Sequence, residues 1–132
     1  MTKKQKELAA KVDGYLTKWM PRMHLDNWLV VLKVLDMPGS ITIAQIDWTP
    51  NYKTAYMVVN SKVENADIEL TDTMLEHRVV HELCHLLTAP IGDVLRRELS
   101  EDGHTYSDFM DATESVTEHL VWIVEKRFAS TS

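Results

Sequence analysis

Cysteine is nearly absent from this chain of 132 residues, and long apolar runs are absent altogether. The single cysteine excludes an internal disulfide framework and is typical of a reducing compartment. No segment approaches the roughly 18 consecutive apolar residues that a membrane span requires. The first 20 residues lack the apolar region of a signal peptide. We therefore expect a cytoplasmic protein that does not enter a membrane.

Positive charge is also in short supply. The chain has 14 Lys and Arg residues against 20 Asp and Glu, which gives a net charge of −6. A nucleic-acid-binding domain usually carries a basic patch, and here the longest basic cluster is a short one at residues 3–6. We therefore expect no nucleic acid partner. The sequence does not indicate an oligomeric state.

The hydrophobic pattern predicts a helix, then strands, then further helices. The first helix covers residues 3–20. Strands are expected at 28–35, 41–48 and 54–60, the last two joined by a hairpin loop at 49–53, with a short strand or a loop at 63–70. Further helices are expected from Thr73 to Pro90, near 91–99 and at 111–128. This order and length are typical of one α+β domain over 1–132, with a small antiparallel or mixed sheet packed against helices.

The most specific local pattern is His81-Glu82-Leu83-Cys84-His85, which reads HExxH. Residues four apart lie one turn apart on one face of a helix, so two imidazoles at this spacing can hold one zinc ion. Glu82 beside them can take a proton from a water molecule. The pattern predicts two metal ligands and a general base.

The residues around the motif favour a helix there. Thr73 and Glu76 match a capping box, S/T-x-x-E, which predicts that the helix begins at this point. Val79, Leu83 and Leu86 fall on one side at about 100° per residue, and the polar residues of the motif fall on the other. Cys84 lies on a different flank from the two histidines, and we interpret it as a packing residue.

A catalytic zinc site needs a third protein ligand. On the last predicted helix, Glu114 and Glu118 lie one turn apart and off the expected apolar stripe of Ala112, Val116, Leu120, Ile123 and Val124. Two like charges at this spacing repel each other, and a zinc ion facing Glu114 would offset that cost. Glu118 could then orient a ligand histidine.

HExxH followed on a later helix by an acid and a second acid four residues on resembles the gluzincins, the thermolysin-like metallopeptidases. Glu114 to Glu118 also resembles the ligand helix of small phage and bacterial gluzincin-like proteins. The resemblance implies a zincin-like fold, Zn²⁺ bound by His81, His85 and Glu114, and Glu118 orienting the first histidine, where the family has Asp. It further implies a peptide substrate that pairs with an edge strand, for which residues 54–60 are our candidate.

A rival ligand is His104. The stretch Asp102-Gly103-His104-Thr105-Tyr106-Ser107-Asp108-Phe109 loosely resembles the HGxxF element of SprT-like proteases, in which a third histidine completes the site. Here no glycine follows His104, and Phe109 comes one residue late. We prefer Glu114.

These observations predict a zinc metallopeptidase in which Glu82 is the general base. Two alternatives stay open. The chain could be a zincin scaffold that binds a protein or peptide with little or no catalysis. Alternatively, the zinc could be structural, with Cys84 or His104 as a fourth ligand.

Overall fold

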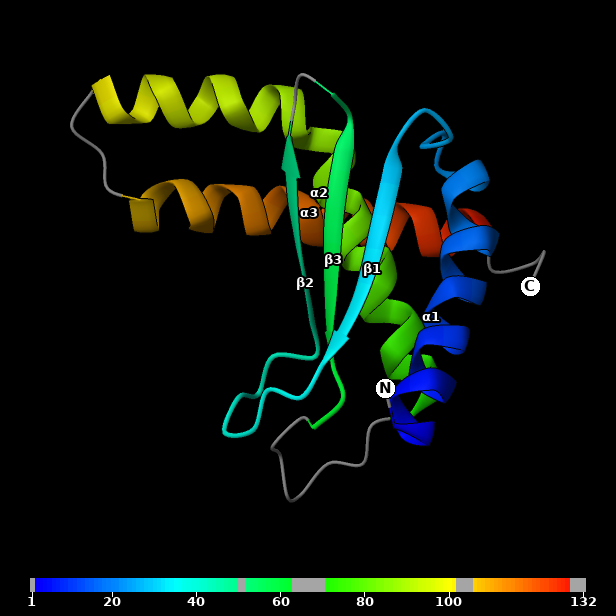
Figure 1. Cartoon of the computed structure of the whole chain (residues 1–132). Coiled ribbons are helices and arrows are strands. Elements are labelled where there is room, and N and C mark those ends of the chain that lie inside the picture. Colours follow the sequence, from blue (N-terminus) through cyan, green and yellow to red (C-terminus); the bar gives the residue numbers. More distant parts are fainter. Residues whose placement is uncertain (1, 50–51, 63–70, 102–105, 129–132) are drawn as a thin grey trace. The chain divides into compact units, whose positions relative to one another are not determined.

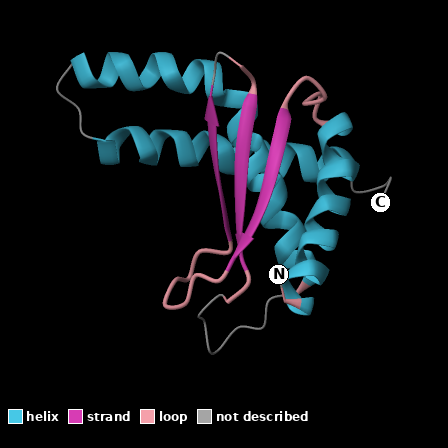
Figure 2. Ribbon diagram, viewed as in Figure 1, coloured by secondary structure: helices cyan, strands magenta, loops and turns pink. Residues whose placement is uncertain are grey.

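The computed structural model describes residues 2–49, 52–62, 71–101 and 106–128. The order of elements is α1 (Lys3–Arg22), β1 (Leu29–Leu35), β2 (Ala44–Thr49), β3 (Thr54–Asn60), α2 (Asp72–Glu101) and α3 (Tyr106–Phe128) (Figures 1 and 2). The prediction of an α+β protein is confirmed. The chain divides into two compact units, Met1–Leu83 and Cys84–Ser132, and the boundary falls inside α2. The single domain over 1–132 stays a prediction.

The sheet of the first unit is mixed. Its strand order is β1-β3-β2, with β1 parallel to β3 and β2 antiparallel to it. The hairpin predicted between the second and third strands is confirmed, since Thr49 pairs with Thr54 across its base. The predicted strand or loop at 63–70 lies outside the described residues.

The central position of β3 corrects one expectation. Residues 54–60 were expected to be a free edge for a substrate, but β3 is bonded on both sides, and β1 and β2 are the edges of the described sheet. The reason is the path of the chain. After β1 the chain leaves room for one strand before it forms β2, and β3 then fills this space between the first two strands. Ala55, Met57 and Val59 on β3 are fully buried, as suits a central strand.

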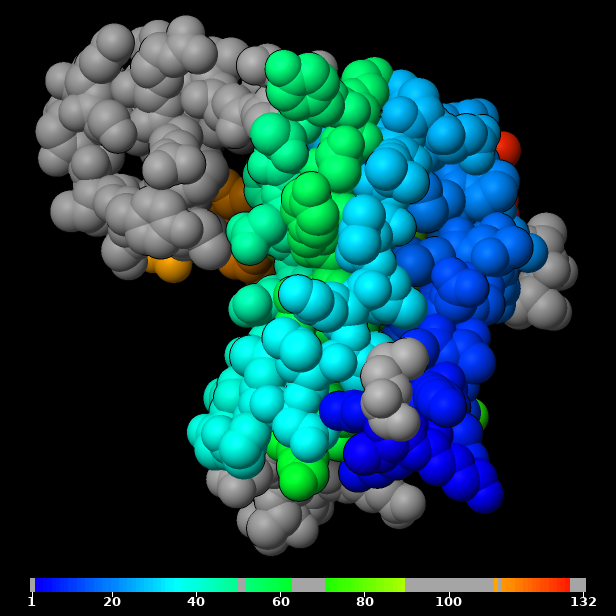
Figure 3. Space-filling view, in the orientation of Figure 1, coloured from blue at the N-terminus to red at the C-terminus, as the bar shows by residue number. Residues whose placement is uncertain are grey.

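One face of the sheet carries the core of this unit. Inward residues alternate with outward ones along each strand, and α1 contacts the sheet through β1. The buried residues of α1 are Val12, Leu16 and Trp19. The outer face keeps large apolar side chains exposed, including Leu29 and Tyr56. Strand residues, coloured cyan to green, form much of the surface that faces the viewer in Figure 3.

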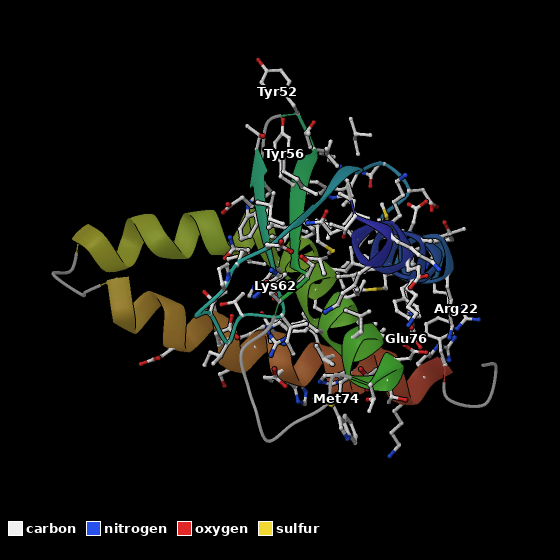
Figure 4. The ribbon with its side chains drawn as sticks, turned by 60° about the horizontal axis from the view of Figure 1, so that its bottom comes forward. Arg22, Tyr52, Tyr56, Lys62, Met74 and Glu76 are labelled. Carbon is white, nitrogen blue, oxygen red and sulfur yellow. The ribbon has the colours of Figure 1, made fainter. Side chains whose placement is uncertain are left out.

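Two side chains of α1 form hydrogen bonds with Glu76 in the first turns of α2. Trp19 Nε1 and Lys18 Nζ donate to Glu76 Oε2 over 2.7 Å and 2.8 Å. Burial raises the pKa of Glu76, but these hydrogen bonds outweigh it, so the pKa lies below its usual value. Arg22 adds positive charge and lies on the same side as Glu76 in Figure 4. This cluster fixes the helix that carries the motif against α1.

The start of α2 differs from the prediction. The helix begins at Asp72, and Thr71 Oγ1 accepts a hydrogen bond from Met74 N over 3.2 Å. The cap is therefore Thr71 rather than Thr73, and the Glu76 carboxylate of the predicted capping box is bound to α1 instead.

The same helix also runs further than predicted. It continues through Pro90 to Glu101, where the sequence suggested two helices separated at the proline. A proline removes one hydrogen bond, to the carbonyl four residues earlier, and the bonds on either side can carry the helix past it. None of the described helices is both long and apolar enough to cross a membrane.

The third helix begins five residues before the predicted 111 and buries a different face. Thr117 and Val121 are 0% and 1% exposed, whereas Val116 and Ile123 from the predicted apolar stripe are 52% and 42% exposed. The buried face of α3 therefore contains Thr117 and Val121, which follow Glu114 by three and seven residues and lie on the same side of the helix.

Candidate metal centre

The HExxH segment lies in the most buried part of α2. All residues from 79 to 86 are buried, including the motif residues His81, Glu82 and His85 at 2%, 7% and 8% exposure. The sequence predicted a helix that buries one side and presents the motif on another, and the structure instead buries both sides. The helix therefore brings three polar side chains into a buried environment, where charge and hydrogen bonding act more strongly than at the surface.

Three of the predicted residues come together at this segment. His81 lies one turn before His85 on α2, and His85 Nε2 is 3.0 Å from Glu114 Oε1 on α3. One potential ligand atom from each of the three residues lies within 4.8 Å of the others. His81, His85 and Glu114 therefore form a cluster that could hold a metal ion.

The contact between His85 and Glu114 is itself informative. A carboxylate oxygen is only an acceptor, and an imidazole nitrogen without a proton is also an acceptor. The two atoms can stand 3.0 Å apart only with a proton or a cation between them. A proton on Nε2 that is donated to Glu114 accounts for this contact, and a bound cation would take the place of that proton.

Glu82 has a cationic neighbour on its own helix. Arg78 Nη1 lies 3.7 Å from Glu82 Oε1, and the Glu82 side chain keeps 9% of its surface exposed. The two side chains lie one turn apart on α2, at i and i+4 spacing.

One residue of the cluster was missed by the sequence analysis. The Oγ1 atom of Thr117 lies 3.4 Å from Nδ1 of His85, on the far side of the ring from Glu114. Thr117 follows Glu114 by three residues, so the same face of α3 carries both. This spacing was the only available signal, because threonine in a helix is common and has no metal-site signature.

Glu118 lies one turn after Glu114, and its side chain is exposed. Its role in orienting a histidine stays a prediction.

Burial raises the pKa of the Cys84 thiol to about 12, with added contributions from Glu125 and Glu118. Such surroundings disfavour the thiolate that a metal ligand requires, and Cys84 is not part of the cluster that the described residues form. The rival ligand, His104, lies outside the described residues.

Comparison of the chain with protein-family models, with curated proteins and with solved structures finds no match in any of the three.

Proposed function

We propose that this protein is a zinc metallopeptidase with a zincin-like, gluzincin-type site. His81, His85 and Glu114 would hold Zn²⁺, and Glu82 would be the general base. The observation that carries the proposal is the meeting of the two motif histidines with the carboxylate of Glu114, 3.0 Å from His85 Nε2.

The donor set supports zinc in particular. Two imidazoles and one carboxylate are a common ligand set of catalytic zinc, which leaves the fourth position open. Two ligand atoms of a tetrahedral site with bonds of about 2.0–2.2 Å stand roughly 3.3 Å apart. The separation of 3.0 Å between His85 Nε2 and Glu114 Oε1 is close to that value. This pair supports the proposal, and the ligand atom of His81 lies within 4.8 Å of both.

The protein's own contribution to hydrolysis would come from Glu82. Zinc, when bound, would polarise a scissile carbonyl and make a water molecule more acidic. Glu82 takes the proton of the attacking water and then delivers it to the leaving amine, so its carboxylate is regenerated. Arg78 lies 3.7 Å from this carboxylate on the same helix. The substrate would be a peptide or a protein.

Substitution of Glu82 separates catalysis from binding. We would load the parent and Glu82→Gln with zinc, verify the metal content of both, and measure cleavage of a peptide library. The parent should cleave, and Glu82→Gln should keep its zinc while losing about 100-fold or more of the rate, because general-base catalysis contributes about that much.

A matched control removes a carboxylate elsewhere. Glu7 is exposed on α1, and Glu7→Gln should cleave like the parent. Equal rates for the parent and Glu82→Gln would contradict the proposed mechanism. A parent that binds zinc and cleaves nothing would favour the alternative of a peptide-binding scaffold.

A further inference from the structure

We infer that the outer face of the sheet is a dimerisation surface, which packs face to face on the same surface of a second copy of this chain. A two-fold axis along the central strand β3 places β1 of one copy over β2 of the other. The inference goes beyond the proposed function, and its test needs neither a metal nor a substrate.

The outer face consists of the strand side chains that point away from the core. Its large apolar members are 62%, 42%, 41% and 51% exposed, and they are Leu29, Val31 and Leu35 of β1 and Tyr56 of β3. This face is turned to the viewer in Figure 3, and Tyr56 is labelled in Figure 4. Large apolar side chains gathered on one surface often mark an interaction site, and two such sheet faces can pack on each other as in a β-sandwich.

The same face carries one positive and one negative side chain, on opposite edge strands. Lys33 on β1 lies beside Val58 of β3, which in turn lies beside Gln45 of β2. Asp47 is two residues further along β2, beside Tyr56. Both charged side chains are exposed. Their positions decide which arrangement of two copies brings opposite charges together.

A two-fold axis parallel to β3 exchanges the edge strands, so β1 of each copy lies over β2 of the other. Lys33 of one copy then lies over Gln45 of the other, and Asp47 of that copy is within diagonal reach of the long lysine side chain. The symmetry gives two such pairs in each dimer. An axis perpendicular to the strands would instead stack β1 on β1 and bring the two Lys33 side chains together. The charges therefore favour the axis along β3.

The size of the face sets the expected affinity. Side chains of about 150–250 Å² at the exposures given above offer roughly 350 Å² of apolar area. A stable dimer buries about 800 Å² on each partner, and the polar residues of this face supply only part of the difference. We therefore expect a weak dimer, with a dissociation constant on the order of 10–100 µM.

Analytical ultracentrifugation of the full chain from about 5 µM to about 1 mM measures the association. Salt at about 0.15 M screens the long-range repulsion between two copies that each carry a net charge of −6. Val31→Asp places a charge on the apolar face and should weaken the dimer at least 10-fold. Val116→Asp makes the same exchange at a valine of α3 that is 52% exposed, and it should associate like the parent. Folding of each variant is checked from its amide NMR spectrum.

Charge reversal tests the arrangement of the two copies. Lys33→Asp and Asp47→Lys should each weaken the dimer about 5-fold, because like charges then face each other in both symmetric pairs. The double variant Lys33→Asp, Asp47→Lys restores opposite charges in exchanged places, and its affinity should return close to that of the parent.

Four results would overturn the inference. The first is a parent that stays monomeric at about 1 mM. The second is an association that Val31→Asp leaves unchanged or that Val116→Asp weakens equally, because the contact would then lie elsewhere. The third is a double reversal that associates no better than the single ones, which excludes the axis along β3. The fourth is growth beyond the dimer, since a two-fold contact is closed.

Discussion

The buried side chain of Asn60 should be among the most sensitive positions of the first unit. Asn60 is 1% exposed and lies at the end of β3, where the chain crosses from β1 to β2. Its Oδ1 accepts from Met37 N and Lys62 N, each over 2.9 Å. Its Nδ2 donates to Thr42 O over 3.0 Å and to Met37 O over 3.2 Å. One amide group thus connects the segment between β1 and β2 with the residues that follow β3.

The expected cost of Asn60→Ala follows from these contacts. The substitution leaves two backbone N–H groups and three carbonyl groups, those of Met37, Ser40 and Thr42, without the partner they have in the parent. Each such group costs about 1–3 kcal/mol when it stays buried. Met37 is half-buried and Lys62 is exposed, so water can replace part of the loss. We therefore expect the free energy of unfolding to fall by about 2–4 kcal/mol in total.

Equilibrium unfolding in urea measures this change. Gln45→Ala is a suitable control, because Gln45 is exposed on β2 and its loss should stay within about 0.5 kcal/mol. A loss below about 1 kcal/mol for Asn60→Ala would refute the reasoning. Water would then bind the backbone groups of the crossover as well as the Asn60 amide does.

Four further predictions concern the two glycines Gly14 and Gly39, the carboxylate of Glu76 on α2 and the thiol of Cys84. Gly14→Ala on α1 should stabilise the protein by about 0.5–1 kcal/mol, because a helix interior favours alanine and no atom lies within 4 Å of the added methyl group. Gly39→Ala should destabilise it by about 1–2 kcal/mol, because Gly39 has φ of +82°, and urea unfolding checks both. The pKa of Glu76 is lower in the folded protein than its usual 4.5, so its contribution to stability is present above that pH and is lost as the pH falls through the folded value. Glu76→Gln should therefore lose less stability than the parent in unfolding curves between pH 6 and pH 3, and parallel curves would contradict this. Cys84 is fully buried with its pKa raised to about 12, so iodoacetamide at pH 8 should alkylate it in urea and leave the native protein unmodified, as mass spectrometry would show.

The cluster of His81, His85 and Glu114 could be predicted from the sequence only as far as local spacing determines it. The two histidines of HExxH are four residues apart, so any helix there brings them to one face. Glu114 was found through a resemblance of motifs and spacing rather than from its environment. The contact of Thr117 with His85 joins residues 32 positions apart, and only the packing of α3 along α2 within the second unit creates it.

The elements were predicted better than their pairing and their faces. The strand at 54–60 was placed at its observed bounds, but its position between β1 and β2 depends on the path of the crossover, which local patterns do not encode. On α3 the apolar stripe was misleading, since Val116 and Ile123 are exposed. Hydrophobic periodicity fails on a helix whose buried face carries polar residues of a site, as it does at Thr117.

The most direct test of the proposed zinc site is the metal content of the purified protein by elemental analysis. The measurement compares the parent with Glu114→Ala and His104→Ala, and with His77→Ala as a control at an exposed histidine one turn before the motif. The account predicts one zinc ion per chain in the parent, in His104→Ala and in His77→Ala, and its loss in Glu114→Ala. Zinc that is lost only in His104→Ala, or a parent that takes up none on reconstitution, would contradict it.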